Sequence, residues 1–544
     1  MNAPRATTTR DRRPDKQMAK QIKHLLRRVR RLGAAPSAAL AGIAAAVLAA
    51  VLVPDRTVAL AVVAAVVVLE FGLVAVMLAR LLAALKEASV APAPAAEAPK
   101  ARQRTGAVLA PLPARKLRPL KRWTARLNQG FSATALPVMY QYADNEKGTY
   151  AFRLAMLDAI VSWRDRVRRE RREPVRRHFD IVLVSNMNLL GGTTASNAEE
   201  VKAYRDAGLS VGLLHQPVFE WNVGREINPK IAELVGGDVV LLGKGDEVTC
   251  DLMIVRFPPS LSRLMDDRPE ITPARTVLLI NQTPFEAYGP DGVGRHFSWD
   301  VATVRDNLKS WVGDSTWYAI GPSVREALEA HHGAEMAGVD LADGYWYGSL
   351  DPDRWRRDGP READGTIRIG RHSRDHALKW QTIAEDLRAT YPDAEDVEIH
   401  VLGGTTAPER VLGRLPGNWT GHPFGSVAPE EFLHGLDVAV YFTAEDYVEA
   451  FGRSPMEAMA AGLPCVMPPR FEPLFGDGGV YCEPEEVEAV VRALMEPGRY
   501  REQSERSLAT VREHFSHEAL LRRVAALGVR VPDLAATASE GGTR

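Results

Sequence analysis

Residues 180–215, DIVLVSNMNLLGGTTASNAEEVKAYRDAGLSVGLLH, are the clearest indication of the fold class. Two short runs of β-branched and aliphatic residues, at 180–185 and 211–215, enclose a more polar segment at 195–207 with helical spacing. Parallel sheets covered by helices produce this alternation, because each buried strand is followed by a crossover helix. Residues 180–215 therefore predict the first strand–helix–strand unit of a doubly wound α/β domain.

The alternation continues along the chain and starts again after a polar hinge near 350–365. Before the hinge, further strands are predicted at 239–243, 251–257 and 276–281; after it, at 366–370, 397–404, 438–443 and 465–467. With 544 residues the chain is long enough for at least two domains. We therefore predict two Rossmann-like doubly wound domains facing a cleft, at 121–355 and 366–510, and a C-terminal helix with a disordered tail at 511–544.

The N-terminal part has a different composition. A basic arm at 1–31 is followed by two apolar runs, 32–54 without any ionisable side chain and 57–85 with only Glu70 and Arg80. At about 1.5 Å per residue each run can cross a hydrocarbon core of about 30 Å, so 32–86 predicts a transmembrane helical hairpin. Basic residues flank the hairpin on both sides, so both ends are expected in the cytoplasm of a multi-pass cell-membrane protein. A cleaved signal peptide and a soluble Ala-rich hairpin are the alternatives.

Residues 87–120 are rich in Ala and Pro, which predicts an extended linker. A helix is predicted at 148–177, and its end, WRDRVRRERREPVRR, either rests on anionic lipid head groups or is a solvated, salt-bridged face. The three cysteines lie far apart in the sequence and have no C-x-x-C spacing. Their spacing argues against a disulfide framework or a structural zinc site, and it fits a reducing compartment.

The stretch EAFGRSPME, residues 449–457, is the most informative about chemistry. Ser454 is a good N-cap and Pro455 suits a first helical position, so a helix is expected to start near Ser454. Glu449 would then lie in the preceding loop and Glu457 in the first turn. Backbone N–H groups of the loop, at Phe451 and Gly452, together with the helix start predict a cradle for an anion.

The run FGRSPMEAMAAGLPCV after Glu449 resembles the Glu-x7-Glu element of the retaining glycosyltransferases of family 4, which have the GT-B fold. The resemblance implies that Glu449 touches the donor sugar and that Glu457 holds the ribose hydroxyls of the nucleotide. That family usually has Gly after the first glutamate, whereas this chain has Ala450. By the same resemblance the enzyme needs no metal and no cofactor besides its nucleotide-sugar substrate.

Two further loops are candidates for donor binding. Gly191 and Gly192, in NMNLLGGTTASN, allow close backbone approach to a ligand, and the resemblance places this loop at the donor diphosphate. The loop GRHSRDHALKW, residues 370–380, is where the family has an Arg and a Lys that neutralise the two phosphates. Lys379 matches the Lys, and either Arg371 or Arg374 matches the Arg.

One expected residue is missing. Many family members have a histidine after a strand of the first domain, but here the strand at 276–280 is followed by Asn281. Asn281 or His296 is the candidate replacement as the contact to the sugar. Asp351 and Asp353 match the D-x-D of metal-dependent transferases, but they lie in the hinge, so we predict no metal site.

These observations predict a membrane-anchored retaining glycosyltransferase of the hexosyltransferase type, acting in the synthesis of a cell-envelope polysaccharide. Its partners would be a nucleoside-diphosphate sugar, a glycan or lipid-linked acceptor and the membrane, but no nucleic acid. A non-catalytic GT-B scaffold at the membrane is the alternative. A glycoside hydrolase fits less well, because its carboxylates must lie roughly 5 to 9.5 Å apart, whereas eight helical residues span about 12 Å. A nucleotide-sugar epimerase would gain little from a membrane anchor.

Overall fold

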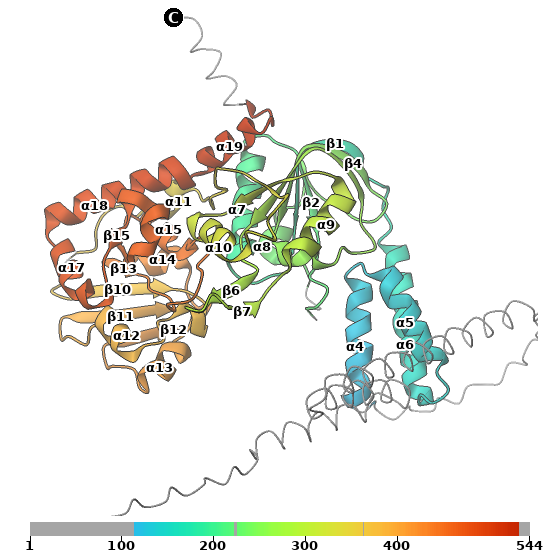
Figure 1. Ribbon diagram of the computed structural model, residues 1–544, viewed down its shortest axis with the longest axis horizontal. Helices are drawn as coiled ribbons and strands as arrows, with labels where there is room; N and C mark the ends of the chain where they lie inside the picture. The colour runs from blue at the N-terminus through green and yellow to red at the C-terminus, as the bar shows by residue number, and fades with distance from the viewer. Residues whose placement is uncertain (1–111, 113, 222–225, 363, 533–544) are drawn as a thin grey trace, which may run out of the picture. The chain divides into compact units, whose positions relative to one another are not determined.

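The computed structural model describes residues 112, 114–221, 226–362 and 364–532. The predicted basic arm, hairpin and most of the predicted linker lie outside these residues, as do residues 533–544. Within the described ranges, no helix combines the length and apolar character needed to cross a bilayer. These ranges form a small helical bundle and two α/β lobes (Figure 1).

The bundle consists of α4 (Ala114–Asn128), α5 (Ser132–Asp144) and α6 (Tyr150–Arg169). Its core contains Leu127, Met139, Phe152, Met156 and Ile160. Helix α4 starts inside the range 87–120 that the sequence predicts as an extended linker, and this part of that prediction is wrong. Leu120, Trp123 and Leu127 recur at helical spacing and pack on the other two helices, which outweighs the Ala- and Pro-rich composition.

Helix α6 also ends earlier than the predicted helix at 148–177. It stops at Arg169, and strand β1 starts at Arg176. Pro174 explains the difference, because its ring removes a backbone donor and disfavours helical geometry at the preceding residue.

The first lobe is a seven-stranded parallel sheet in the order β3-β2-β1-β4-β5-β8-β9. Its strands are β1 (Arg176–Ser185), β2 (Val211–His215), β3 (Val239–Leu241), β4 (Glu247–Arg256), β5 (Glu270–Ile280), β8 (Thr316–Ala319) and β9 (Asp340–Leu341). Val182 and Val184 point into one hydrophobic cluster and Ile181 and Leu183 into the other, so both faces of β1 are buried. Helices α7 (Gly192–Asp206), α8 (Pro229–Ala232), α9 (Val301–Val312) and α10 (Pro322–His332) belong to this lobe, and β6 (Phe285–Tyr288) and β7 (Gly294–Phe297) form a hairpin.

The second lobe repeats this plan with a six-stranded parallel sheet in the order β12-β11-β10-β13-β14-β15. Its strands are β10 (Ile367–His372), β11 (Val397–Leu402), β12 (Trp419–His422), β13 (Val438–Val440), β14 (Cys465–Met467) and β15 (Val480–Tyr481). Its helices include α12 (Ala384–Thr390), α13 (Thr406–Leu412), α14 (Pro429–His434), α15 (Arg453–Ala460), α17 (Val487–Leu494) and α18 (Pro497–Thr510). In each sheet the strand order reverses beside the first strand, which makes a topological switch point. The predicted pair of doubly wound α/β domains, each with a parallel sheet, is confirmed.

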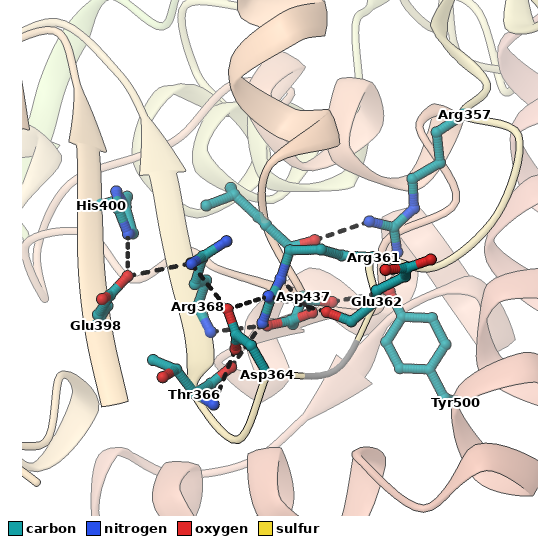
Figure 2. Close-up of polar contacts among 11 residues, drawn as sticks. Arg357, Arg361, Glu362, Asp364, Thr366, Arg368, Glu398, His400, Asp437 and Tyr500 are labelled. Atoms are coloured by element: carbon teal, nitrogen blue, oxygen red, sulfur yellow. Dashed lines mark hydrogen bonds and ion pairs between the residues drawn. The ribbon is translucent and has the colours of Figure 1, made fainter. Parts of the chain in front are cut away.

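The chain enters the second lobe through a polar network (Figure 2). The guanidinium of Arg361 donates to the carboxylate of Asp437, with Nη2 2.9 Å from Oδ2, and pairs with Asp364. The same Asp437 oxygen accepts a hydrogen bond from the backbone N–H of Arg368 in β10. This network therefore fastens the end of the hinge to the central strand of the sheet.

The aspartates of the hinge have structural partners. Asp351 caps α11 (Pro352–Trp355) by accepting from the backbone N–H of Asp353, and Asp353 pairs with Arg512 at 3.2 Å. Within the described residues, no group of three or more His, Cys, Asp or Glu side chains is placed to hold a metal ion.

The end of the chain returns to the first lobe. Helix α19 (His517–Ala526) packs against α7, and its Leu520 and Val524 join the core of the first lobe. His517 Nε2 lies 3.2 Å from the carboxylate of Glu199 in α7. Part of the predicted C-terminal segment 511–544 is therefore a structural element of the first lobe, because its apolar face completes that core.

Candidate functional site

A pocket of about 370 Å³ opens between the two lobes. Its walls come from the carboxyl ends of the strands: from the loops after β1, β2, β4, β5 and β8 in the first lobe and after β10 and β13 in the second. Ligands of doubly wound sheets bind at these strand ends. Of the sequence-predicted site residues, those in the pocket wall are Gly192, Asn281, Arg374, Lys379, Glu449, Phe451 and Gly452.

Glu449 lies in the loop before α15, and 12% of its side chain is exposed. The ammonium of Lys379 contacts its Oε2, and the hydroxyl of Tyr441 donates to the same oxygen at 2.6 Å. Burial raises the pKa of Glu449, but the charge of Lys379 and the two hydrogen bonds outweigh it and hold the pKa below its usual value. Glu449 is therefore an ionised acceptor at the wall of the pocket.

Lys379 ends the short 3-10 turn Ala377–Lys379 that follows β10. Burial lowers the pKa of its ammonium, but the carboxylate of Glu449 raises it by more, so the pKa lies well above its usual value. Its Nζ also lies 4.8 Å from the centroid of the Tyr447 ring, in a cation–π arrangement. The pocket thus holds a fixed positive charge next to a fixed negative charge.

Helix α15 begins at Arg453, and its N-cap is Gly452 rather than Ser454 as the sequence predicted. Gly452 has a φ of +79°, a left-handed conformation that glycine adopts without the strain of a side chain. Gly452, Arg453 and Ser454 all line the pocket, so the N-terminal end of the helix faces it. The first backbone N–H groups of a helix have no intrahelical acceptor and attract anions.

Glu457, one turn into α15, is not in the pocket wall. Its Oε2 lies 2.7 Å from Nε2 of His372, and its Oε1 lies 2.6 Å from Nε of Arg453. Burial raises the pKa of Glu457, but the charge of Arg453 and the contact with His372 outweigh it and lower the pKa. The two glutamates therefore have different positions. Glu449 lines the pocket, whereas Glu457 lies behind Arg453, and Arg453 lines the pocket.

The first-lobe loop at the start of α7 faces this arrangement. Gly191 has a φ of +115°, and a side-chain carbon built there would lie 3.8 Å from Cδ of Arg374. The glycine loop of the first lobe and the basic loop of the second lobe therefore meet across the pocket. Helix α7 begins at Gly192, three residues before the predicted start at Ala195, so Gly192, Thr193 and Ser196 belong to its first turns and line the pocket.

The two candidate arginines differ in position. Arg374 lines the pocket, whereas Arg371 is buried beneath it. The guanidinium of Arg371 donates to the carbonyl oxygens of Phe442, at 2.8 Å, and Lys379, at 2.6 Å. It also stacks over the ring of Trp380, with 4.1 Å between Cζ and the centroid. Arg371 thus holds the backbone of Lys379 in place and, in contrast to the prediction, does not line the pocket.

Asn281 and His296 are also separated. Asn281 lines the pocket, and its Nδ2 donates to Oγ1 of Thr193 at 3.2 Å. Its Oδ1 is buried and has no hydrogen-bond partner within the described residues. His296 is exposed on β7 and is not in the pocket wall. Of the two, Asn281 is therefore the residue placed to meet a ligand.

Several pocket residues were not predicted from the sequence. Tyr441 follows β13 directly, and its place at the end of a strand was a signal that could have identified it. Trp221 and Phe257 stack edge-to-face with 5.6 Å between ring centroids, and both line the first-lobe side. Phe257 has a φ of +81°, a strained backbone for a residue with a large side chain, and such strain is found mostly at functional sites.

No protein-family model matches this sequence, and curated protein sequences gave no match. Among solved structures, a glycosyltransferase from Rickettsia africae ESF-5 is similar, with 10% identity over 65% of this chain and 98% of that chain and a TM-score of 0.44. An α,α-trehalose 6-phosphate synthase from Burkholderia multivorans has 13% identity over 68% and 99%, with a TM-score of 0.40. S. aureus TarM, in a complex with UDP, has 14% identity over 51% and 55%, with a TM-score of 0.35.

Proposed function

We propose that this protein is a retaining glycosyltransferase that moves a sugar from a nucleoside diphosphate to a hydroxyl of an acceptor. The observation that carries the proposal is the contact of Lys379 and Tyr441 with one oxygen of Glu449, inside the pocket between the two sheets. A fixed carboxylate can accept hydrogen bonds from sugar hydroxyls, and an adjacent ammonium can meet a phosphate.

The charges around the pocket suit an activated sugar. The diphosphate would lie near Lys379, Arg374 and the N-terminal end of α15, where positive charge is concentrated. Negative charge grows on the leaving nucleotide as the glycosidic bond breaks, so preorganised positive groups stabilise the transition state more than the ground state. We expect Lys379 to act chiefly on this step, and Glu449 to orient the sugar.

The other parts of the proposal rest on the sequence. Retention of the anomeric configuration and binding of the ribose by Glu457 follow from the resemblance to family 4. The apolar runs at 32–54 and 57–85 support a membrane anchor, and an anchored enzyme favours a lipid-linked or cell-envelope glycan as acceptor. Trp221 and Phe257 give the first-lobe side of the pocket aromatic surfaces on which a sugar ring of the acceptor can stack.

The test is to incubate the full chain, purified in detergent, with a panel of nucleoside-diphosphate sugars. Thermal protection identifies the donor, and mass spectrometry of a reaction with a lipid-linked acceptor identifies the product. Proton NMR of the first-formed product gives its anomeric configuration. A non-catalytic scaffold predicts no transfer with any donor. Transfer with inversion of the anomeric configuration would contradict the retaining mechanism but not the transferase activity.

Two variants sharpen this test. Lys379→Ala is expected to slow transfer by about two orders of magnitude, because one preorganised charge is lost. Arg410→Ala, which removes an exposed arginine from α13 outside the pocket, is the matched control and should leave the rate unchanged. Equal rates for both variants would remove Lys379 from the mechanism.

A further inference from the structure

The helical bundle before the first lobe is strongly basic. Residues 114–169 contain 12 Lys and Arg but only 4 Asp and Glu, which gives a formal charge of +8, whereas the whole chain has −1. Helix α4 alone holds six of these basic residues and no acidic one. Charge of one sign on one element predicts an anionic partner for it.

Four of the six basic residues of α4 are exposed, and they gather on one face. The opposite face packs into the bundle through Leu120, Trp123 and Leu127. At 100° per residue, Arg118 lies almost directly opposite these three positions, and the other exposed basic residues lie within about 70° of it. We define this α4 basic face by the exposed side chains Arg115, Arg118, Lys121 and Arg122.

These side chains differ from other arginines in the bundle and in the segment that follows it. Arg172 pairs with the buried Asp246, and Arg166 donates to Asn128, so these arginines hold the structure together. By contrast, no ion pair joins any residue of the α4 basic face to another described residue. A cluster of like charges without counter-charges repels itself, so it gains most from an external anion.

From this basic face the geometry points to a docking surface for a bilayer that contains anionic lipids. The chain just before α4 carries the two apolar runs at 32–54 and 57–85, so the basic face follows the segments best suited to enter a bilayer. The neighbouring helix α6 also exposes Tyr150, Leu157 and Val161, an apolar stripe at helical spacing. A bundle that exposes both basic and apolar side chains has the two kinds of group that bind a head-group layer.

The docking surface adds to the proposed function. The proposed anchor holds the chain at a membrane of any lipid composition, whereas the α4 basic face requires negative charge. Docking would also hold the first lobe at the bilayer, since the bundle is bonded to that lobe by Ser132 and Thr134, which contact Asp267 and Asp266. The inference rests on the proposed function in one respect, the membrane anchor that places the chain at a bilayer.

The experiment places a fluorescent label on this face. The chain has three cysteines, all buried, so Lys121→Cys provides one reactive thiol. The full chain is reconstituted in phosphatidylcholine nanodiscs with or without phosphatidylglycerol, and quenching by a head-group-attached quencher is measured. Lys309→Cys, on α9 of the first lobe, is the label control.

We expect the label at position 121 to be quenched more in nanodiscs with phosphatidylglycerol than in those without it, and this difference to shrink at high salt. The label at position 309 should show neither effect. The substitutions Arg118→Glu and Arg122→Glu together should lower the docking equilibrium constant by about thirtyfold or more, since each lost arginine accounts for about a factor of five. The pair Arg410→Glu and Arg414→Glu, on and after α13, is the matched control and should change nothing. Thermal denaturation of the variants checks that they fold.

Equal quenching in nanodiscs with and without phosphatidylglycerol would overturn the inference, because the anchor alone would then explain it. So would a label that responds to soluble polyphosphate in detergent but not to anionic nanodiscs, which would make this face a site for a polyanion. Transfer measured in detergent is independent of docking. Loss of docking with intact transfer therefore refutes the surface and leaves the proposed activity standing.

Discussion

The guanidinium of Arg126, in α4, donates a hydrogen bond of 2.9 Å to the carbonyl oxygen of Trp221, which lines the first-lobe side of the pocket. The same guanidinium stacks on Phe219, with 4.4 Å between Cζ and the ring centroid, and Arg263 stacks on the same ring at 4.2 Å. Arg126 is almost fully buried, so this contact links the helical bundle to the pocket.

Replacing Arg126 is therefore expected to affect the acceptor more than the donor. Arg126→Met keeps the apolar bulk but leaves the Trp221 carbonyl without its donor, which costs about 1 to 3 kcal/mol of folding free energy. We expect KM for the acceptor to rise about tenfold, with donor affinity measured by calorimetry unchanged. Arg126→Lys should recover part of the loss. Equal weakening of donor and acceptor would show that the variant disturbs the whole pocket.

Tyr441 provides a test through the pH dependence of activity. The hydrogen bond from its hydroxyl lowers the pKa of Glu449, whose carboxylate is needed in its ionised form. Activity should therefore be present above the pKa of Glu449 and lost as the pH falls through it. In Tyr441→Phe the pKa of Glu449 rises, so the acid limb of the pH–rate profile for kcat moves to higher pH, and transfer falls about tenfold at neutral pH.

The control for that shift is Tyr500→Phe. Tyr500 donates to the carbonyl oxygen of Asp437 in the second lobe, outside the active pocket. Its loss should lower stability but leave the acid limb where it is. The same limb position in Tyr441→Phe and in the unmodified chain would show that the hydroxyl does not tune Glu449.

Arg256 and Glu200 form an ion pair that is completely buried between β4 and α7. Glu200 also accepts a hydrogen bond from Nε1 of Trp346 at 3.2 Å. Arg256→Met leaves this carboxylate buried without its counter-charge, so the free energy of unfolding should fall by about 3 to 5 kcal/mol. Urea denaturation measures the loss.

A double variant separates the buried charge from the lost packing. Arg256→Met combined with Glu200→Gln removes the uncompensated charge but keeps an acceptor for Trp346. It should be more stable than Arg256→Met alone. If it is less stable, the ion pair is not the source of the loss.

The sequence predicted the central strands of both sheets because their signal is local, but it did not predict the outer strands β8, β9, β12 and β15. Each buried strand is a short apolar run, and runs separated by helical segments determine a parallel sheet without any knowledge of distant contacts. Predictions failed where a longer-range contact decided the outcome. Helix α19 returns to the first lobe because Leu520 and Val524 complete a core built from residues more than 200 positions earlier in the chain, such as Val201.

In the pocket the main error concerned strand length. The predicted strand at 366–370 ended two residues too early, which placed Arg371 in the loop with Arg374. Because β10 continues to His372, side chains alternate through Arg371. Arg371 therefore points to the same face of the sheet as Ile369. His372 points to the opposite face, where it contacts Glu457. If the predicted strand had been two residues longer, the sequence alone would have placed Arg371 in the strand and Arg374 in the loop.

His215 is expected to limit stability in acid. It ends β2, and its Nδ1 accepts a hydrogen bond of 3.0 Å from the backbone N–H of Met187, in the loop that leads to Gly191. Burial lowers its pKa from 6.5 to about 4, so the folded protein holds this imidazole neutral. The unfolded chain takes up a proton as the pH falls below 6.5, and the folded chain does so only near pH 4.

The unfolded chain binds more protons than the folded chain between pH 4 and 6.5, so the free energy of unfolding rises with pH in this range. Stability is fully present above pH 6.5, falls as the pH drops from 6.5 towards 4, and loses about 3 kcal/mol in total. In His215→Gln this part of the acid loss should disappear, while His178→Gln, at an exposed position on β1, should retain it. Urea unfolding at several pH values gives the slope for each protein. A slope between pH 4 and 6.5 that is the same in His215→Gln as in the unmodified chain would mean that other groups cause the acid loss.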